Sequence, residues 1–344
     1  MASTDISEDA AFLGLDIGGQ SVKGLRLEGD GKVSRRSAMP TPASSGAEAV
    51  LSVVAAVLTE LCADGSVATV GAGTPGGVDG SGRIVGDAAN ISDWKGVDLR
   101  SAISRAAGAC VSASVRNDGN LAAYAEWAVR GGASRALLFV GLGTGVGGGY
   151  IEEGRILGGV DDKALEIGHV IVYPEGRKCA CGRSGCVEAY ASGPSIGRLA
   201  VEMASRYDTP LALAVRSGAD IDAREVYEAF AKADGLAVAV HLVVEEALSR
   251  VIGQALAFLA PDTVVLGGGV LAGAASLVAD VARLAPRYVF AAASEGVRFE
   301  AALLGAEAGL LGAALYGAST VLSREELFGL SGRAGLCTTR PVRT

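Results

Sequence analysis

Two stretches of the sequence repeat one pattern and decide the fold: residues 12–27 read FLGLDIGGQSVKGLRL, and residues 136–156 read ALLFVGLGTGVGGGYIEEGRI. In each, an apolar run ends in a glycine turn and a second apolar run follows, which predicts two strands joined by a tight turn. The strands are expected at 12–17 and 22–27, and at 136–141 and 148–156. The second stretch resembles the first, so we predict a weak internal repeat of two α/β halves.

Apolar runs of strand and helix spacing alternate along the rest of the chain. Such alternation predicts a wound α/β architecture in two lobes, with a ligand cleft between them by default. The predicted helices are at 45–63, 98–107, 119–130, 194–206, 223–233, 235–259, 271–284 and 304–317, and further strands are predicted at 67–73, 111–116 and 263–266. We predict a flexible N-terminus (1–10), a small α/β lobe (11–118 with a C-terminal helix at about 304–320), a large α/β lobe (119–303) and a loosely attached tail (321–344).

Composition excludes several classes of protein. Half of the 344 residues are hydrophobic and 20% are charged, which is typical of a globular chain that folds without disulfides. The formal net charge of −8 argues against nucleic acid as a partner. Neither a membrane span nor a secretory signal is predicted, because charges interrupt the apolar stretch 235–260 and the N-terminus is acidic. We therefore expect a soluble cytoplasmic protein.

The first glycine turn joins a carboxylate to a possible phosphate cradle. Asp16 ends the first strand, and the turn at Gly18-Gly19 exposes backbone N–H groups before Lys23. Such a turn can hold phosphate, with Asp16 reaching Mg²⁺ through water. An ordinary hairpin turn is the alternative.

The second glycine turn, residues 141–149, has almost no side chains, so something bulky is expected to pass close to its backbone. Its N–H groups and the Thr144 hydroxyl suit a triphosphate. No Gly-Lys-Ser/Thr follows, and a strand rather than a helix comes next, so this turn matches neither the Walker nor the dinucleotide pattern. A glycine-rich bend in a sheet is the alternative.

A third motif, Asn117-Asp118-Gly119-Asn120, lies between a predicted strand and a predicted helix. Asp118 could cap that helix. A carboxylate at a strand end facing a cleft is also where a general base for a hydroxyl would lie.

The fourth motif carries the most specific signal. His169, one of two histidines in the chain, precedes Cys179, Cys181 and Cys186 within 17 residues, and Glu188 follows. One imidazole and three thiolates fit a closed, tetrahedral zinc site, and four protein ligands leave no position for a catalytic water. We predict a structural zinc ion.

Taken together, these motifs resemble the ROK family of repressors and kinases, which includes bacterial glucokinases. The resemblance covers about residues 11–320. It rests on these motifs: DxGGxxxK at 16–23, GTPGGVD at 73–79, Asn90…Trp94, Asn117-Asp118, GTGxGGG at 143–149, GH…CxCGxxGCxE at 168–188 and LGGGV at 266–270. It implies the actin-like (ribonuclease H-like) two-lobed ATPase fold, ATP-dependent phosphorylation of a sugar hydroxyl, and a homodimer or homotetramer.

The resemblance also implies roles for individual residues. Asp118 would take the proton of the sugar hydroxyl, and His169 would hold zinc with one ring nitrogen and face the sugar with the other. The residues implied to contact the sugar are Gly76, Gly77, Asn90, Asn117, Asp118, Glu166, His169 and Glu188. Those implied to contact ATP and its Mg²⁺ are Asp16, Gly18, Gly19, Gln20, Lys23, Gly143, Thr144, Gly145, Gly267, Gly268 and Gly269.

The sequence departs from the family at two places. Gln20 replaces a usual Thr, and the loop 159–165 (GVDDKAL) is charged, with Leu165 where Gly is usual. That loop is expected near the sugar, so we keep glucose as the first substrate and an amino sugar, a mannose-type sugar or a C7-cyclitol as alternatives. Polyphosphate remains an alternative phosphate donor.

Two non-enzymatic alternatives remain. A sugar-responsive repressor is disfavoured, because the first strand near residue 12 leaves no room for a DNA-binding domain. A catalytically dead sugar-binding protein is disfavoured by Asp118 and the two glycine turns.

Overall fold

The computed structural model describes residues 10–86, 91–108 and 111–333. The chain forms two compact units. The first unit comprises Met1–Arg135, Gly149–Ala164 and Ala306–Thr344, and the second comprises Ala136–Gly148 and Leu165–Gly305. Residues 119–135 and 149–164 therefore belong to the first unit, whereas the sequence analysis expected them in the large lobe 119–303.

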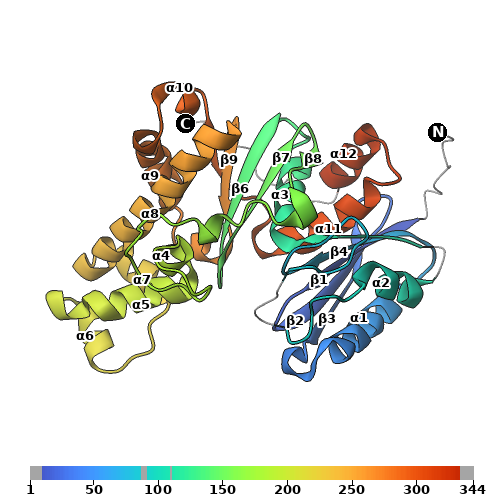
Figure 1. The fold of residues 1–344 in the computed structure, drawn as a ribbon, viewed down its shortest axis with the longest axis horizontal. Coiled ribbons are helices and arrows are strands. Elements are labelled where there is room, and N and C mark those ends of the chain that lie inside the picture. The colour runs from blue at the N-terminus through green and yellow to red at the C-terminus, as the bar shows by residue number, and fades with distance from the viewer. Residues whose placement is uncertain (1–9, 87–90, 109–110, 334–344) are drawn as a thin grey trace. The chain divides into compact units, whose positions relative to one another are not determined.

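The first unit is built on a five-stranded sheet with the order β3-β2-β1-β4-β5 (Figure 1). The expected hairpin is present: β1 (Ala11–Ile17) pairs antiparallel with β2 (Ser21–Leu27), which pairs with β3 (Val33–Pro40). On the other side, β4 (Val67–Thr74) and β5 (Ser112–Asn117) run parallel to β1. The carboxyl ends of β1, β4 and β5 therefore lie at one edge of the sheet.

Helices cover both faces of this sheet (Figure 1). On one face α1 (Ala47–Leu61) and α2 (Leu99–Ala107) bury Leu13 and Leu15 of β1 among apolar side chains. On the other face α11 (Ala308–Ala318) contacts β1, β4 and the helix α3 (Asp118–Val129). A Cβ at Gly71 would lie 1.8 Å from the Ala313 carbonyl oxygen, so glycine in β4 is what lets α11 approach so closely.

A second five-stranded sheet has the order β10-β9-β6-β7-β8. It contains β6 (Ala136–Leu142), β7 (Val146–Glu152), β8 (Arg155–Ile156), β9 (Thr263–Gly267) and β10 (Arg298–Ala301). Strands β6, β9 and β10 are parallel, and β7 pairs antiparallel with β8. The helices of the second unit are α4 (Glu188–Ala191), α5 (Gly193–Met203), α6 (Pro210–Arg216), α7 (Ala223–Phe230), α8 (Gly235–Leu259), α9 (Leu277–Leu284) and α10 (Ala291–Ser294).

Most predicted elements are confirmed within a few residues, but three predictions were wrong. The single strand predicted at 148–156 is two strands, β7 and β8, joined by a turn at Glu153-Gly154, where both residues have positive φ. The helix predicted at 271–284 is a 3₁₀ turn (Gly269–Ala272) followed by α9, because Gly273 interrupts it. Part of the supposed loose tail forms α12 (Arg324–Arg333), whose Phe328 ring packs 5.2 Å from that of Trp127. The expected flexible residues 1–9 and 334–344 lie outside the described residues.

Within the described part of the chain, no helix is both long and apolar enough to cross a membrane.

Candidate functional site

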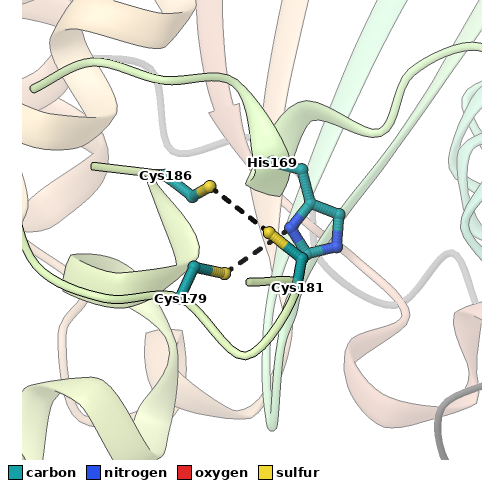
Figure 2. Close-up of side chains that lie close together, drawn as sticks. All are labelled: His169, Cys179, Cys181 and Cys186. Atoms are coloured by element: carbon teal, nitrogen blue, oxygen red, sulfur yellow. Dashed lines mark hydrogen bonds between the residues drawn. The ribbon is translucent and has the colours of Figure 1, made fainter. Parts of the chain in front are cut away.

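Four potential metal ligands converge in the second unit. His169 ends a 3₁₀ turn (Ile167–His169), and Cys179, Cys181 and Cys186 lie on the loop that follows (Figure 2). Their ligand atoms all lie within 4.8 Å of one another. The Cys181 and Cys186 sulfurs are 3.6 Å apart, close to the edge of a tetrahedron with zinc–sulfur bonds of about 2.3 Å.

The histidine is oriented for two roles. Its Nδ1 lies 3.8 Å from the Cys179 sulfur, and Figure 2 shows the other ring nitrogen pointing away from the cysteines. His169 is exposed, whereas Cys179 and Cys186 are buried. One ring nitrogen can therefore hold a metal while the other remains available to a ligand.

The loop reaches this arrangement through glycine. Gly182 and Gly185 have φ of 86° and 81°, and a Cβ at Gly185 would lie 1.6 Å from the Tyr173 carbonyl oxygen. Only glycine adopts such a close, left-handed turn without strain. Burial is the main cause that raises the pKa of Cys186 to about 12, so the thiol is protonated on its own, and a bound divalent ion would favour the thiolate. The set fits a closed structural zinc site.

Glu188 connects this cluster to the second glycine turn. Its Oε2 accepts a hydrogen bond of 3.1 Å from the Val146 N–H, and its Oε1 lies 3.7 Å from the Cys179 sulfur. A Cβ at Gly145 would lie 2.6 Å from Glu188 Oε2. Glycine at 145 therefore makes room for the carboxylate, which holds the start of β7 beside the metal ligands.

The same turn borders a pocket of about 1090 Å³ within the second unit. Gly143 and Thr144 line it together with Gly269 and Val270, and the Gly193 N–H at the start of α5 donates to the Gly143 carbonyl at 2.8 Å. The structure thus brings together the residues expected at the phosphates and the adenosine. Gly145, Gly267 and Gly268 lie next to these residues in the chain but do not line the pocket; Gly268 packs on Leu142.

Sequence reasoning missed Arg198, which lines this pocket from α5 and donates to the Ser195 hydroxyl at 2.9 Å. No sequence motif distinguishes Arg198, because an arginine on an amphipathic helix is usually a solvated surface residue.

In the first unit, the first glycine turn is a regular hairpin. Asp16 is opposite Lys23 across β1 and β2, and the Gly18 N–H donates to the Ser21 carbonyl. Burial raises the pKa of Asp16, and the charge of Lys23 partly opposes this. Gln20 is exposed, and its carbonyl accepts from the Thr41 N–H.

The Asn117-Asp118 motif stands where β5 meets α3. Asn117 caps the helix, since its side-chain oxygen accepts from the N–H groups of Gly119 and Asn120. Its amide donates to the Gly76 carbonyl at 3.4 Å. The cap is therefore Asn117, whereas the sequence offered Asp118, which is the exposed first residue of the helix.

The remaining predicted sugar contacts fall in different parts of the chain. Gly77 follows Gly76 in the first unit, and Glu166 is exposed in the second, just before the metal-binding turn. Asn90 lies outside the described residues.

Comparison with known proteins identifies the family of the chain. The model of the ROK family matches residues 12–318. A glucokinase of Halalkalibacterium halodurans is 31% identical over 316 residues, covering 88% of this chain and 94% of its own. A kanosamine kinase of Amycolatopsis mediterranei is 31% identical over 271 residues, covering 78% and 84%.

A solved structure shares the fold as well. The chain superimposes on a ROK family glucokinase from Streptomyces griseus, in complex with glucose and AMPPNP, with a TM-score of 0.74 and 27% identity over 90% of this chain and all of the other. The chain belongs to the ROK family. Within that family it is a sugar kinase, an ATP-dependent phosphotransferase with the two-lobed actin-like fold.

Proposed function

We propose that this kinase phosphorylates a hydroxyl of glucose or a closely related sugar, with Asp118 as the general base. One observation carries the proposal: the Asn117 cap fixes Asp118 at the carboxyl end of β5 and also holds the Gly76 carbonyl. A carboxylate fixed beside backbone acceptors at the edge of a sheet can bind a polyol and take a proton from it.

The proposed mechanism relies on positioning. Asp118 accepts the proton as the sugar oxygen attacks the terminal phosphate of ATP, and Gly76, Gly77, Asn90 and Asn117 orient the sugar. Glu166, Glu188 and the free ring nitrogen of His169 hold further hydroxyls.

The proposed nucleotide contacts in the second unit are Gly143 and Thr144, which line its pocket, with Gly145 and Gly267–Gly269 beside them. Those proposed in the first unit are Asp16, Gly18, Gly19, Gln20 and Lys23. Mg²⁺ supplies charge neutralisation when bound, and zinc is structural.

The related kanosamine kinase and the charged loop 159–165 favour a second candidate acceptor. An amino sugar, a mannose-type sugar or a C7-cyclitol would place different groups against this loop. One changed hydrogen-bond partner can alter discrimination between acceptors by orders of magnitude.

The test is ATP-dependent ADP release across a panel of hexoses, amino sugars and cyclitols. Asp118→Asn should still bind the acceptor but lose turnover by about 10²- to 10⁴-fold. Near-normal turnover of this variant would contradict the assignment of the base. A sugar that binds without any turnover would favour a non-catalytic, sugar-responsive protein, and polyphosphate should replace ATP in a parallel assay.

Two broader proposals accompany this function. A homodimer or homotetramer is proposed from the family resemblance, and light scattering after size exclusion tests it. A cytoplasmic location is proposed because three reduced thiols are required at the metal cluster.

A further inference from the structure

The charged loop that departs from the family contains a buried carboxylate in the first unit. The Asp162 side chain is 1% exposed, although Asp161 and Lys163 on either side form an exposed ion pair of 3.0 Å. A buried carboxylate is costly unless both oxygens find donors. Asp162 must therefore have a specific partner.

Both oxygens of Asp162 contact the residues directly before Asp118. Oδ1 accepts from the Arg116 guanidinium at 2.9 Å, and Oδ2 accepts from the Asn117 backbone N–H at 3.2 Å. Strand β5 is an edge strand, so none of the described strands pairs with it on the side away from β4. The carboxylate thus completes the hydrogen bonding of the last residue of β5, which is also the cap of α3.

Arg116 is itself held from a second direction. Its Nε and Nη2 donate to the Tyr316 hydroxyl at 2.9 and 2.7 Å, and its guanidinium lies 5.2 Å from the centre of that ring. Tyr316 belongs to α11, which packs on the sheet. The guanidinium therefore connects the loop to a rigid part of the unit.

The loop adopts an unfavourable backbone to present this carboxylate. Asp161 and Asp162 have φ of 58° and 51°, a left-handed conformation that is unfavourable for a non-glycine residue. A Cβ at Gly158 would lie 2.0 Å from Asp162 Oδ1, so only glycine admits the carboxylate there. The Asp161 carbonyl also accepts from the Val78 N–H at 2.9 Å, next to Gly76 and Gly77.

We propose that Asp162 is a positioning residue: its buried carboxylate fixes Arg116 and Asn117, and through them sets the place of Asp118 against the acceptor hydroxyl. This inference rests on the proposed function, because it assigns Asp162 a part in that reaction. If the carboxylate contributed only to stability, its removal would lower the unfolding free energy but would not change kcat.

The test compares Asp162→Asn with the wild type in the ADP-release assay, using the best acceptor of the panel. An asparagine can accept only one of the two hydrogen bonds. Because small misplacements of a reacting group can cost about 100-fold, we expect kcat to fall by about 10- to 100-fold. The KM for ATP should not change, since the residues lining the nucleotide pocket are in the second unit.

Asp30→Asn is the matched control. Asp30 lies in the turn between β2 and β3 of the same unit and forms an exposed ion pair with Lys32, so removing its charge should leave kcat within about twofold of the wild type. Asp162→Gly is the second variant, because glycine adopts the left-handed backbone without strain and should fold even if Asp162→Asn does not.

The outcomes separate the two proposals. A kcat loss in every Asp162 variant that folds, with Asp30→Asn normal and the KM for ATP unchanged, supports the inference. A wild-type kcat in either folded Asp162 variant, or an equal loss in Asp30→Asn, overturns it and leaves the proposed function intact. Absence of turnover by the wild type on every acceptor overturns the proposed function and this inference with it.

Discussion

Gly145→Ala should displace the Glu188 carboxylate and so weaken both the fold and the proposed binding of the acceptor. The added methyl would lie 2.6 Å from Glu188 Oε2, well inside the 3.4 Å at which ordinary contact begins. Backbone strain is not involved, because Gly145 does not have a positive φ. The obstacle is the end of a flexible side chain, so the carboxylate can move aside while the turn keeps its course.

The magnitude follows from the hydrogen bonds that Glu188 would lose. Losing the bond from the Val146 N–H should cost about 1–3 kcal/mol of unfolding free energy if that group is left unpaired. A displaced carboxylate would also lose its proposed hydrogen bond to the acceptor, worth about 1.5–3 kcal/mol for a charged group. At 1.36 kcal/mol per factor of ten, kcat/KM should fall by about 10- to 100-fold.

The measurement is kcat/KM for the acceptor together with the melting temperature, and Gly147→Ala is the control. Gly147 lies in the same turn, and nothing is within 4 Å of its added Cβ, so that variant should behave like the wild type. If Gly145→Ala retains the wild-type kcat/KM, or if both variants lose activity equally, Glu188 does not act on the acceptor.

Three further predictions address other parts of the molecule. Burial raises the pKa of Asp16 above its ordinary value of 3.8. The ionised side chain therefore lowers the unfolding free energy, and this loss increases as the pH rises from 3.8 through the raised pKa. Asp16→Asn should therefore be more stable than the wild type at pH 7, with the gain lost below pH 3.8, and should lose turnover; equal pH-dependent melting of the two proteins would contradict this. Gly158→Ala should lower kcat as Asp162→Asn does, because its Cβ would lie 2.0 Å from Asp162 Oδ1, whereas Gly80→Ala, with open space at its Cβ, should not. Metal analysis should find about one zinc per chain, and chelation or Cys186→Ser should lower the unfolding free energy by on the order of several kcal/mol; an unchanged melting curve would argue against a structural site.

The sequence predicted the central elements of the fold because their patterns are local. Both glycine turns, the buried strands β4, β6 and β9 and the long helix α8 have apolar periodicity that needs no partner to be recognised. The strand β3 was missed because VSRRSAMP is an edge strand, mostly exposed, with little apolar alternation. The helix α12 was missed because it packs through few residues, among them Phe328.

Some features of the candidate site could be predicted from the sequence and others could not. The metal cluster was predictable because all four ligands lie within 18 residues, so short-range spacing alone brings them near one another. The choice between Asn117 and Asp118 as the helix cap was not predictable, because both are good caps and only the backbone direction at the end of β5 selects one.

By itself, the sequence determined the family, the two glycine turns and the chemical types at the site, because each is encoded in neighbouring residues. Only the tertiary structure decided that Asp162 is buried and bound to Arg116 and Asn117, which are some 45 residues away in the chain. The physical reason is that a carboxylate in a charged, glycine-rich loop is as a rule solvated. Its burial depends on donors that the folding of a distant edge strand brings to it.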